Sequence, residues 1–339
     1  TVIDFFDGGW TEGAAIYRAW FEANLPAGAS KTAETGRDRL PAWYYDSPLM
    51  VSYPVRGIHD MDEMKPNALF PYVNALPLLD DIAARTGCRL MALLMHWEGT
   101  APWAPPYVWP PYGGVDCFNE FRDALHERGH LLGVYCSGFG YTKQSNLLPF
   151  GLEEEFERDG NAEAMTADEA GEVRISRICT GQRSGYDLCV ANAKARRILA
   201  RAYGPLFASG ADYAQILDQN HGGGQYFCYA RGHEHAPCPG EWMTDSMQHL
   251  LTDWNREAGS MLLGCESAAS EPFIGNLRFS DNRYELNWHF DTPVPLYAFV
   301  YHEYVRNFMG NQVSCGLTQL EDTLRLRMAY SFAAGDCMT

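Results

Sequence analysis

Two carboxylates stand directly after apolar runs of the kind that form buried strands in this 339-residue chain. Asp218 closes the expected strand at residues 213–218, and Glu266 closes the next one at residues 260–266. A carboxylate just past a buried strand loses hydration, so it must be paired, hydrogen-bonded or used in chemistry. Retaining cleavage of a glycosidic bond needs two carboxylates about 5–5.5 Å apart. Because neighbouring parallel strands lie about 4.8 Å apart, this pair is expected to fall in that range.

The two carboxylates differ in reach, which suggests different roles. We assign Asp218 as the nucleophile because its side chain is short and rigidly placed, and Glu266 as the general acid/base because its longer side chain can reach the leaving oxygen. Gln219 and Asn220 follow the nucleophile and are expected to orient it or to bind substrate hydroxyls. The alternative for either carboxylate is an ion pair with an arginine of the fold.

A second glutamate competes for the acid role. Glu303 follows the apolar run at residues 295–301, which we predict to be a strand, and His302 beside it is a candidate substrate contact. The alternative for Glu303 is a carboxylate at the positive end of a helix dipole.

Other expected strand ends carry candidate substrate contacts. Trp97 and Glu98 follow the strand at residues 89–96, and Glu98 is expected to accept a hydrogen bond from a substrate hydroxyl. Tyr135 lies near the end of the strand at residues 130–137, where it is expected to face the substrate. Trp103 belongs to an aromatic loop with five prolines, which could stack on sugar rings or form a packed surface flap.

The loop after Asp218 holds Cys228, His233, His235 and Cys238. Two thiols and two imidazoles can bind zinc tetrahedrally, although the spacing C-x4-H-x-H-x2-C is not a familiar zinc pattern. A disulfide between the two cysteines is a second possibility, and a plain loop in which a histidine touches substrate is preferred. No metal or cofactor is therefore assigned.

The elements that position these residues alternate between strand and helix. Strands are predicted at residues 49–55, 89–96, 130–137, 213–218, 260–266 and 295–301, and helices at residues 76–86, 118–128, 190–207, 243–258 and 317–334. This alternation predicts a parallel sheet covered on both faces. No glycine-rich phosphate loop follows the first strand, and long loops follow the strands, which favours a (β/α)8 TIM-type barrel over an open sheet.

The barrel is expected to be incomplete, because about six strands are evident where a closed barrel needs eight. We expect a lead-in helix and linker at residues 1–40 and the barrel at residues 41–339, with a long insertion at about residues 138–185. The tail at residues 335–339 could start a seventh strand of a protein that continues further. The alternative is a permuted barrel that uses residues 1–6 as a strand.

Composition limits the partners. The formal net charge is −17, which disfavours nucleic acid and anionic membrane surfaces. No apolar run approaches the roughly 20 residues that span a bilayer. Four of the ten cysteines, Cys88, Cys136, Cys265 and Cys315, lie in or beside apolar runs and are interpreted as core residues. The compartment stays open, with an extracellular or periplasmic location slightly favoured, and the oligomeric state is undetermined.

Four short motifs carry a family resemblance: Met95-His-Trp-Glu-Gly99, Gly129-His-Leu-Leu-Gly-Val-Tyr135, Ile216-Leu-Asp-Gln-Asn220 and Gly264-Cys-Glu-Ser-Ala268. From about Asp4 onward the chain resembles a largely uncharacterised group of bacterial glycoside-hydrolase-like barrels. More distantly, it is similar to the endo-α-N-acetylgalactosaminidases and the α-amylase superfamily. In those families an Asp after strand four is the nucleophile and a Glu after strand five is the acid/base, an order that Asp218 and Glu266 match.

The resemblance implies a retaining hydrolase of α-linked sugars in oligosaccharides, polysaccharides or glycoconjugates. The third carboxylate of the amylase pattern would have to be Asp336 or lie beyond the chain. Two alternatives remain: a carbohydrate-binding barrel without catalysis, and a metal-dependent barrel hydrolase.

Overall fold

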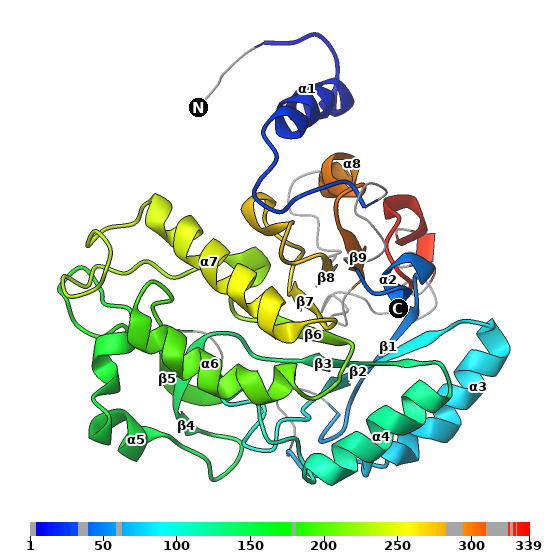
Figure 1. The fold of residues 1–339 in the computed structure, drawn as a ribbon, viewed down its shortest axis with the longest axis horizontal. Helices are drawn as coiled ribbons and strands as arrows, with labels where there is room; N and C mark the ends of the chain where they lie inside the picture. Colours follow the sequence, from blue (N-terminus) through cyan, green and yellow to red (C-terminus); the bar gives the residue numbers. More distant parts are fainter. Residues whose placement is uncertain are drawn as a thin grey trace.

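A parallel sheet forms the centre of this α/β fold (Figure 1). The computed structural model describes residues 5–32, 40–58, 63–177, 181–282, 294–309, 325, 328–329 and 331–339. The sheet order is β1-β2-β3-β6-β7, and all four pairings are parallel. The strands are β1 (Leu49–Pro54), β2 (Leu90–Met95), β3 (Leu131–Tyr135), β6 (Tyr213–Leu217) and β7 (Leu262–Cys265). Five of the six predicted strands are thus confirmed.

Both faces of this sheet are buried, which explains its continuous apolar runs. Along β2, Leu90, Ala92 and Leu94 join the hydrophobic core that also contains the buried residues of the covering helices. The alternating residues Met91, Leu93 and Met95 join a second cluster. That second cluster also draws on other strands, through Leu131, Tyr135, Tyr213, Leu262, Phe279 and Phe308. One face of the sheet therefore packs against the helices, and the opposite face contributes to the second cluster.

Four amphipathic helices cover the sheet: α3 (Leu76–Thr86), α4 (Val115–Glu127), α6 (Ala193–Phe207) and α7 (Glu241–Ala258) (Figure 1). Helix α7 buries Met247, Leu250, Leu251, Trp254 and Ala258, the spacing of one helical face. Helix α6 begins after Asn192, whose side chain accepts hydrogen bonds from the Lys194 and Ala195 amides. Shorter helical segments are α2 (Trp43–Asp46), η1 (Tyr72–Ala75), α5 (Glu153–Arg158), η2 (Asn161–Ala164), η3 (His221–Gly223) and η4 (Glu271–Phe273).

The strand predicted at residues 295–301 is wrong, because this segment forms helix α8 (Leu296–Tyr301). Helix α1 (Trp10–Ala23) packs beside it, as Figure 1 shows. The Phe21 ring meets the Tyr301 ring edge-on at 5.0 Å. Short apolar runs do not distinguish a strand from a covered helix, since in both cases apolar side chains meet neighbours on more than one side.

Two short strands extend the fold beyond β7. They are β8 (Phe279–Asp281) and β9 (Arg306–Phe308), which pair in parallel. Parallel bridges join Glu266 to Asp281, and Phe308 to Cys337 in the tail that was expected to begin a strand. The Met50 amide of β1 donates a hydrogen bond of 2.9 Å to the Met338 carbonyl. The helix predicted at residues 317–334 lies largely outside the described residues, as do most of residues 1–6.

The long polar insertion contains an antiparallel pair, β4 (Gly140–Ser145) and β5 (Arg183–Asp187). Of the four cysteines predicted to be core residues, Cys136 and Cys265 are buried and Cys315 lies outside the described residues. Cys88 is exposed, so that prediction is wrong: it stands in the turn between α3 and β2.

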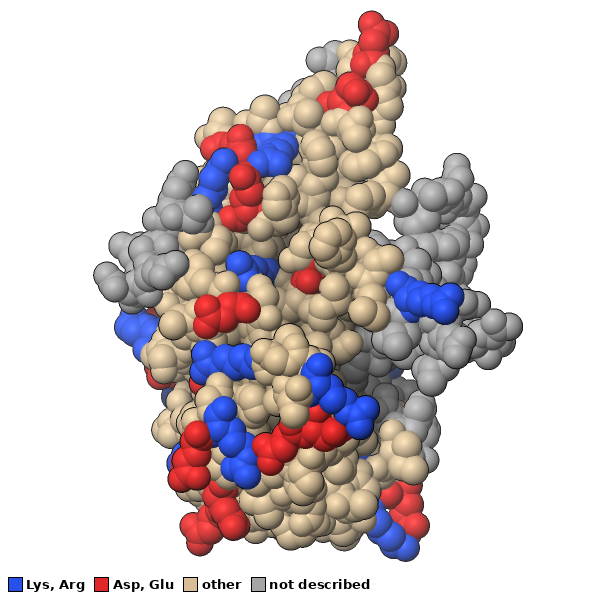
Figure 2. All heavy atoms as spheres, turned by 90° about the vertical axis from the view of Figure 1, so that its right-hand side faces the viewer, with Lys and Arg blue, Asp and Glu red and all other residues tan. Residues whose placement is uncertain are grey.

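The surface mixes charges of both signs. On the face drawn in Figure 2, acidic and basic side chains lie beside one another and form no single acidic patch. Ion pairs such as Arg128–Asp80 account for part of this mixing. Among the described residues, no helix has the length and apolar character to cross a membrane.

Candidate active site

Three side chains from neighbouring strands meet at one end of the sheet. Asp218 follows β6, Glu266 follows β7, and all but about 7% and 5% of their surfaces are buried. The Tyr135 hydroxyl, at the end of β3, lies 2.5 Å from Asp218 Oδ1 and 2.9 Å from Glu266 Oε2. Because both contacts involve the same hydroxyl oxygen, the distance between Asp218 Oδ1 and Glu266 Oε2 is at most the sum of the two contact distances.

The shared hydroxyl also constrains where protons can lie. A tyrosine hydroxyl has one hydrogen, so Tyr135 donates to one carboxylate at a time. The shorter contact is the one with Asp218. The Glu266 oxygen lies within hydrogen-bond distance of the same hydroxyl, at 2.9 Å. Tyr135 therefore bridges the two carboxylates.

Two tryptophans support Tyr135, and they differ in access to the site. Trp97 is fully buried in the hydrophobic core, and its indole N–H donates a 2.7 Å hydrogen bond to the Tyr135 carbonyl. It therefore presents no free ring face to a ligand, contrary to its predicted role as a substrate contact. Trp103 packs edge-on against the Tyr135 ring at 5.8 Å. The buried Trp103 indole N–H has no hydrogen-bond partner among the described residues.

Glu98 lies beyond the end of β2 and is almost completely buried. Burial raises the pKa of Glu98 to about 7, and the nearby Asp218 charge acts in the same direction. Within the described part of the chain, Glu98 Oε2 makes no hydrogen bond. The preceding strand end is strained, since His96 adopts a left-handed φ of 55°. Glu98 thus offers an unsatisfied acceptor oxygen close to the carboxylate pair.

Gln219 and Asn220 make hydrogen bonds within the protein. Gln219 Oε1 accepts a hydrogen bond of 2.7 Å from Arg183 in β5. Asn220 Oδ1 accepts one from the Phe139 amide at 3.0 Å, and its amide group donates to the Gly224 carbonyl at 3.0 Å. These contacts fix the segment after Asp218, and the orienting role of the two residues stays a prediction.

Two residues near the pair were not predicted. His221 Nε2 lies 3.4 Å from Glu266 Oε1, and the His221 side chain is 60% exposed. The sequence places His221 three residues after Asp218, but only the η3 turn brings it to Glu266. Asp281 ends β8, is almost fully buried, and forms the backbone bridge with Glu266. A strand of three residues gives no recognisable apolar run, so Asp281 could not be found from the pattern.

Glu303 and His302 do not lie at a strand end, because the preceding segment is α8. Glu303 forms ion pairs with Arg18 and Lys31 beside α1. His302 is exposed, and its ring Nδ1–H donates to the Ala298 carbonyl at 2.6 Å. The structure therefore gives Glu303 an ion-pairing role and does not support it as a rival acid. Asp336, the other candidate carboxylate, is partly buried, and the loss of hydration raises its pKa to about 6. It accepts a hydrogen bond from Asn282.

A groove of about 1090 Å³ lies between residues 168–177 of the insertion and residues 225–229 of the loop that follows Asp218. Its lining includes Arg174, Gln225, Tyr226, Phe227 and Tyr229. The Tyr226 hydroxyl donates a hydrogen bond of 2.9 Å to the Gln219 carbonyl, so the groove wall joins the residue that follows Asp218.

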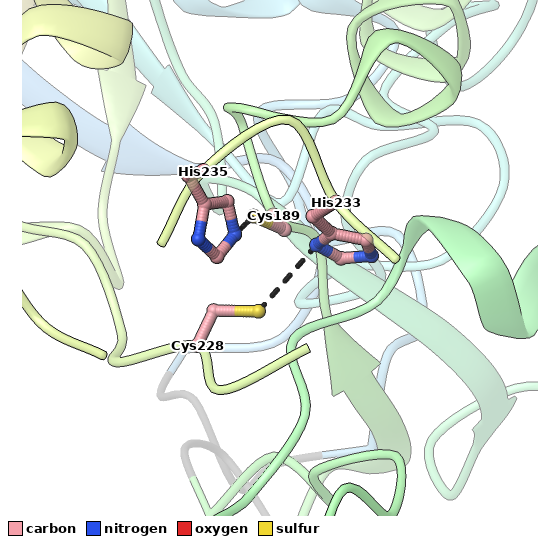
Figure 3. Close-up of side chains that lie close together, drawn as sticks. All are labelled: Cys189, Cys228, His233 and His235. Carbon is pink, nitrogen blue, oxygen red and sulfur yellow. Dashed lines mark hydrogen bonds between the residues drawn. The ribbon is translucent and has the colours of Figure 1, made fainter. Parts of the chain in front are cut away.

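The structure brings together a cysteine–histidine cluster that differs from the predicted one in a single cysteine. Cys189, Cys228, His233 and His235 place their ligand atoms within 4.8 Å of one another (Figure 3). Cys238 is exposed and does not belong to this group, so the structure does not support its pairing with Cys228. The sequence could not identify Cys189, because it lies far from the loop along the chain.

Known structures share the fold. The α-N-acetylgalactosaminidase NagBb from Bifidobacterium bifidum superposes with a TM-score of 0.70 at 19% identity, covering 98% of this chain and 54% of that one. The α-galactosidase TtGalA from Thermus thermophilus gives a TM-score of 0.60 at 17% identity, covering 98% and 62%. This chain thus spans roughly half to three-fifths of the length of these glycoside hydrolases. A search of curated protein sequences gives no match. A family model matches residues 1–311, and the chain belongs to that family, the domain of unknown function DUF6259.

Proposed function

We propose that this chain is a retaining glycoside hydrolase that cleaves α-linked sugars, with Asp218 as nucleophile and Glu266 as general acid/base. The observation that carries the proposal is the Tyr135 hydroxyl within hydrogen-bond distance of both carboxylates. It implies a short separation of the pair, as a double displacement requires. The glycosidase fold of the structural neighbours supports the same reaction class.

The proposed reaction has two steps. Asp218 attacks the anomeric carbon and forms a glycosyl ester, while Glu266 gives its proton to the departing glycosidic oxygen. Glu266 then takes a proton from water, the water oxygen bonds to the anomeric carbon, and the Asp218 carboxylate leaves. Tyr135 donates its hydrogen bond to the charged Asp218 before attack, which holds the carboxylate in position and limits its rotation.

Galacto-configured α-glycosides are the first substrates to consider, because the structural neighbours are an α-N-acetylgalactosaminidase and an α-galactosidase. Glu98 Oε2 and the Trp103 indole N–H offer one buried acceptor and one buried donor for sugar hydroxyls. We assign the groove lined by Tyr226 and Phe227 to the part of the substrate beyond the cleaved bond.

The proposal includes a closed barrel. The pairings run from β1 through β7, then by bridges and pairs through β8 and β9 to Cys337. The hydrogen bond from the Met50 amide to the Met338 carbonyl returns the path to β1. With the tail as its last strand, this ring has the eight members of a (β/α)8 barrel, and the carboxylates lie at the ends of its fourth and fifth strands.

A panel of aryl glycosides tests the proposal. We expect hydrolysis of the α-galactoside or the α-N-acetylgalactosaminide, with the α-anomer formed first, as followed by proton NMR. Asp218→Asn and Glu266→Gln should each abolish turnover while the circular dichroism spectrum stays unchanged, and Glu303→Gln should keep it. Initial release of the β-anomer would exclude retention. Saturable sugar binding without any product would instead favour a non-catalytic carbohydrate-binding barrel.

A further inference from the structure

We propose that Cys189, Cys228, His233 and His235 form a structural zinc site that fixes the loop following Asp218. The four ligand atoms lie within 4.8 Å of one another (Figure 3). Thiolate and imidazole are the ligands that zinc prefers, and a set of two cysteines and two histidines is typical of closed tetrahedral sites.

The spacing of the ligand atoms fits one metal ion. Cys189 Sγ lies 3.4 Å from His235 Nε2, and Cys228 Sγ lies 3.5 Å from His233 Nδ1. With Zn–S near 2.3 Å and Zn–N near 2.0–2.1 Å, tetrahedral geometry places a sulfur and a nitrogen about 3.5 Å apart. Each cysteine–histidine pair therefore already has the separation that a shared zinc ion requires.

The hydrogen bonds of the two imidazoles leave the correct nitrogens free to bind. His233 Nε2 lies 2.9 Å from the Glu163 carbonyl, and His235 Nδ1 lies 2.7 Å from the Ala236 carbonyl. A carbonyl oxygen only accepts, so each of these nitrogens carries the ring hydrogen. The nitrogens that face the thiols, His233 Nδ1 and His235 Nε2, then present lone pairs. Metal-bound histidines show this same outer hydrogen bond to a carbonyl or carboxylate.

Contacts with neighbouring residues hold Cys228 and His235 in place. Cys228 is buried, and the Ala167 amide donates a hydrogen bond to its sulfur at 3.4 Å. The His235 ring stacks on Trp242 with centroids 3.7 Å apart and planes 9° apart. Cys189 lies just after β5, whereas the other three residues belong to the loop between η3 and α7. A bound ion would therefore tie the segment that follows β5 to the loop that follows the proposed nucleophile.

Four protein ligands complete a tetrahedral shell, so this site leaves no open position for a substrate or a catalytic water. The same loop carries Gln225, Tyr226 and Phe227, which line the groove beside Gln219. We therefore assign the ion a structural role in shaping the groove wall, and the site stands whether or not the proposed hydrolysis is correct.

Elemental analysis of the full chain, purified under reducing conditions from medium that contains trace metals, tests the site. We expect about one zinc per chain in the wild type and in Cys238→Ser, which changes an exposed cysteine of the same loop outside the cluster. Cys189→Ser, Cys228→Ser and His233→Ala should each retain less than a fifth of that zinc. Iron in place of zinc, or full zinc retention by the cluster variants, would overturn the assignment.

A measurement on the wild type alone decides the case if the cluster variants fail to fold. Cobalt added to the chelator-treated chain should give thiolate-to-cobalt charge-transfer bands and the strong visible bands of tetrahedral cobalt. Chelation should also lower the Tm by at least about 5 °C, and added zinc should restore it. A chain that binds neither metal, or in which mass spectrometry finds Cys189 and Cys228 joined as a disulfide under those conditions, would contradict the proposal.

Discussion

The Tyr135 hydroxyl lies 2.5 Å from Asp218 Oδ1, so a side chain of one strand holds the carboxylate that ends the strand beside it. The Tyr135 backbone is fixed in turn by the buried Trp97 indole, whose N–H donates to its carbonyl. The position of the proposed nucleophile therefore depends on groups from three neighbouring strands.

Tyr135→Phe should lower kcat by about 100-fold with little change in KM. The variant keeps the ring and its packing but removes the hydrogen bond that holds the Asp218 carboxylate in position, and misplacement of a reacting group by about 1 Å typically costs this much. Tyr141→Phe is the matched control, because Tyr141 is equally buried but its hydroxyl contacts Asn161 and Glu155. Steady-state kinetics on an aryl α-glycoside would measure both. Undiminished kcat in Tyr135→Phe would remove this hydroxyl from the mechanism.

Glu98 should make folding stability depend on pH. Its pKa is raised by burial from 4.5 to about 7, so between these values the folded state holds a proton that the unfolded state releases. The free energy of unfolding should therefore fall as pH rises from about 4.5 to 7 and level off above, by about 3 kcal/mol in total from this group.

Urea unfolding of the wild type and of Glu98→Gln at pH 4.5 and pH 8 isolates that contribution. The amide stays neutral, so the variant should lack this share of the pH dependence, while all other titrating groups act equally in both proteins. The same pH slope in the two proteins would show that the Glu98 carboxyl is not held protonated by the fold.

Gly138 has a left-handed φ of 83° where the chain passes close to the segment after Asp218. A Cβ there would lie 2.9 Å from Asn220 Oδ1 and 3.2 Å from the Gln219 amide nitrogen. Gly129 also has a left-handed φ, of 74°, but a Cβ there would meet nothing within 4 Å.

Gly129→Ala should thus cost only the backbone strain, about 1–2 kcal/mol of unfolding free energy, and leave kcat unchanged. Gly138→Ala should cost more and also lower kcat, because Asn220 and Gln219 must shift. Denaturant unfolding and kinetics on the two variants give this comparison directly. If Gly138→Ala and Gly129→Ala lose the same stability and both keep the wild-type kcat, the close approach of Gly138 to Gln219 and Asn220 does not matter for activity.

The central strands could be predicted because each is buried on both faces and reads as a continuous apolar run. The same criterion failed at residues 295–301, which form helix α8. In this helix the Tyr301 ring contacts Phe21 of α1, and the Tyr297 hydroxyl donates a hydrogen bond to the Ala269 carbonyl in the segment after β7. Strands as short as β8 and β9 give no pattern above the background of isolated apolar residues.

For the site, strand-end position identified Asp218, Glu266 and Tyr135, which the structure brings together. It could not place His221 beside Glu266, because that contact depends on the path of the η3 turn. It also could not pair Cys189 with the histidine loop, since that contact depends on how the insertion folds back. Contacts across long sequence separations follow from tertiary packing, which a single sequence does not reveal.

The most direct test of the two carboxylate roles is azide rescue of Asp218→Gly and Glu266→Gly on an activated aryl α-glycoside. Azide can occupy the space of either missing side chain, but the two positions lie on opposite sides of the anomeric carbon. Rescue of Asp218→Gly should give the β-glycosyl azide, whereas rescue of Glu266→Gly should give the α-glycosyl azide through the intact nucleophile. An exchanged pair of anomers, or full turnover without azide in either variant, would contradict the assignment.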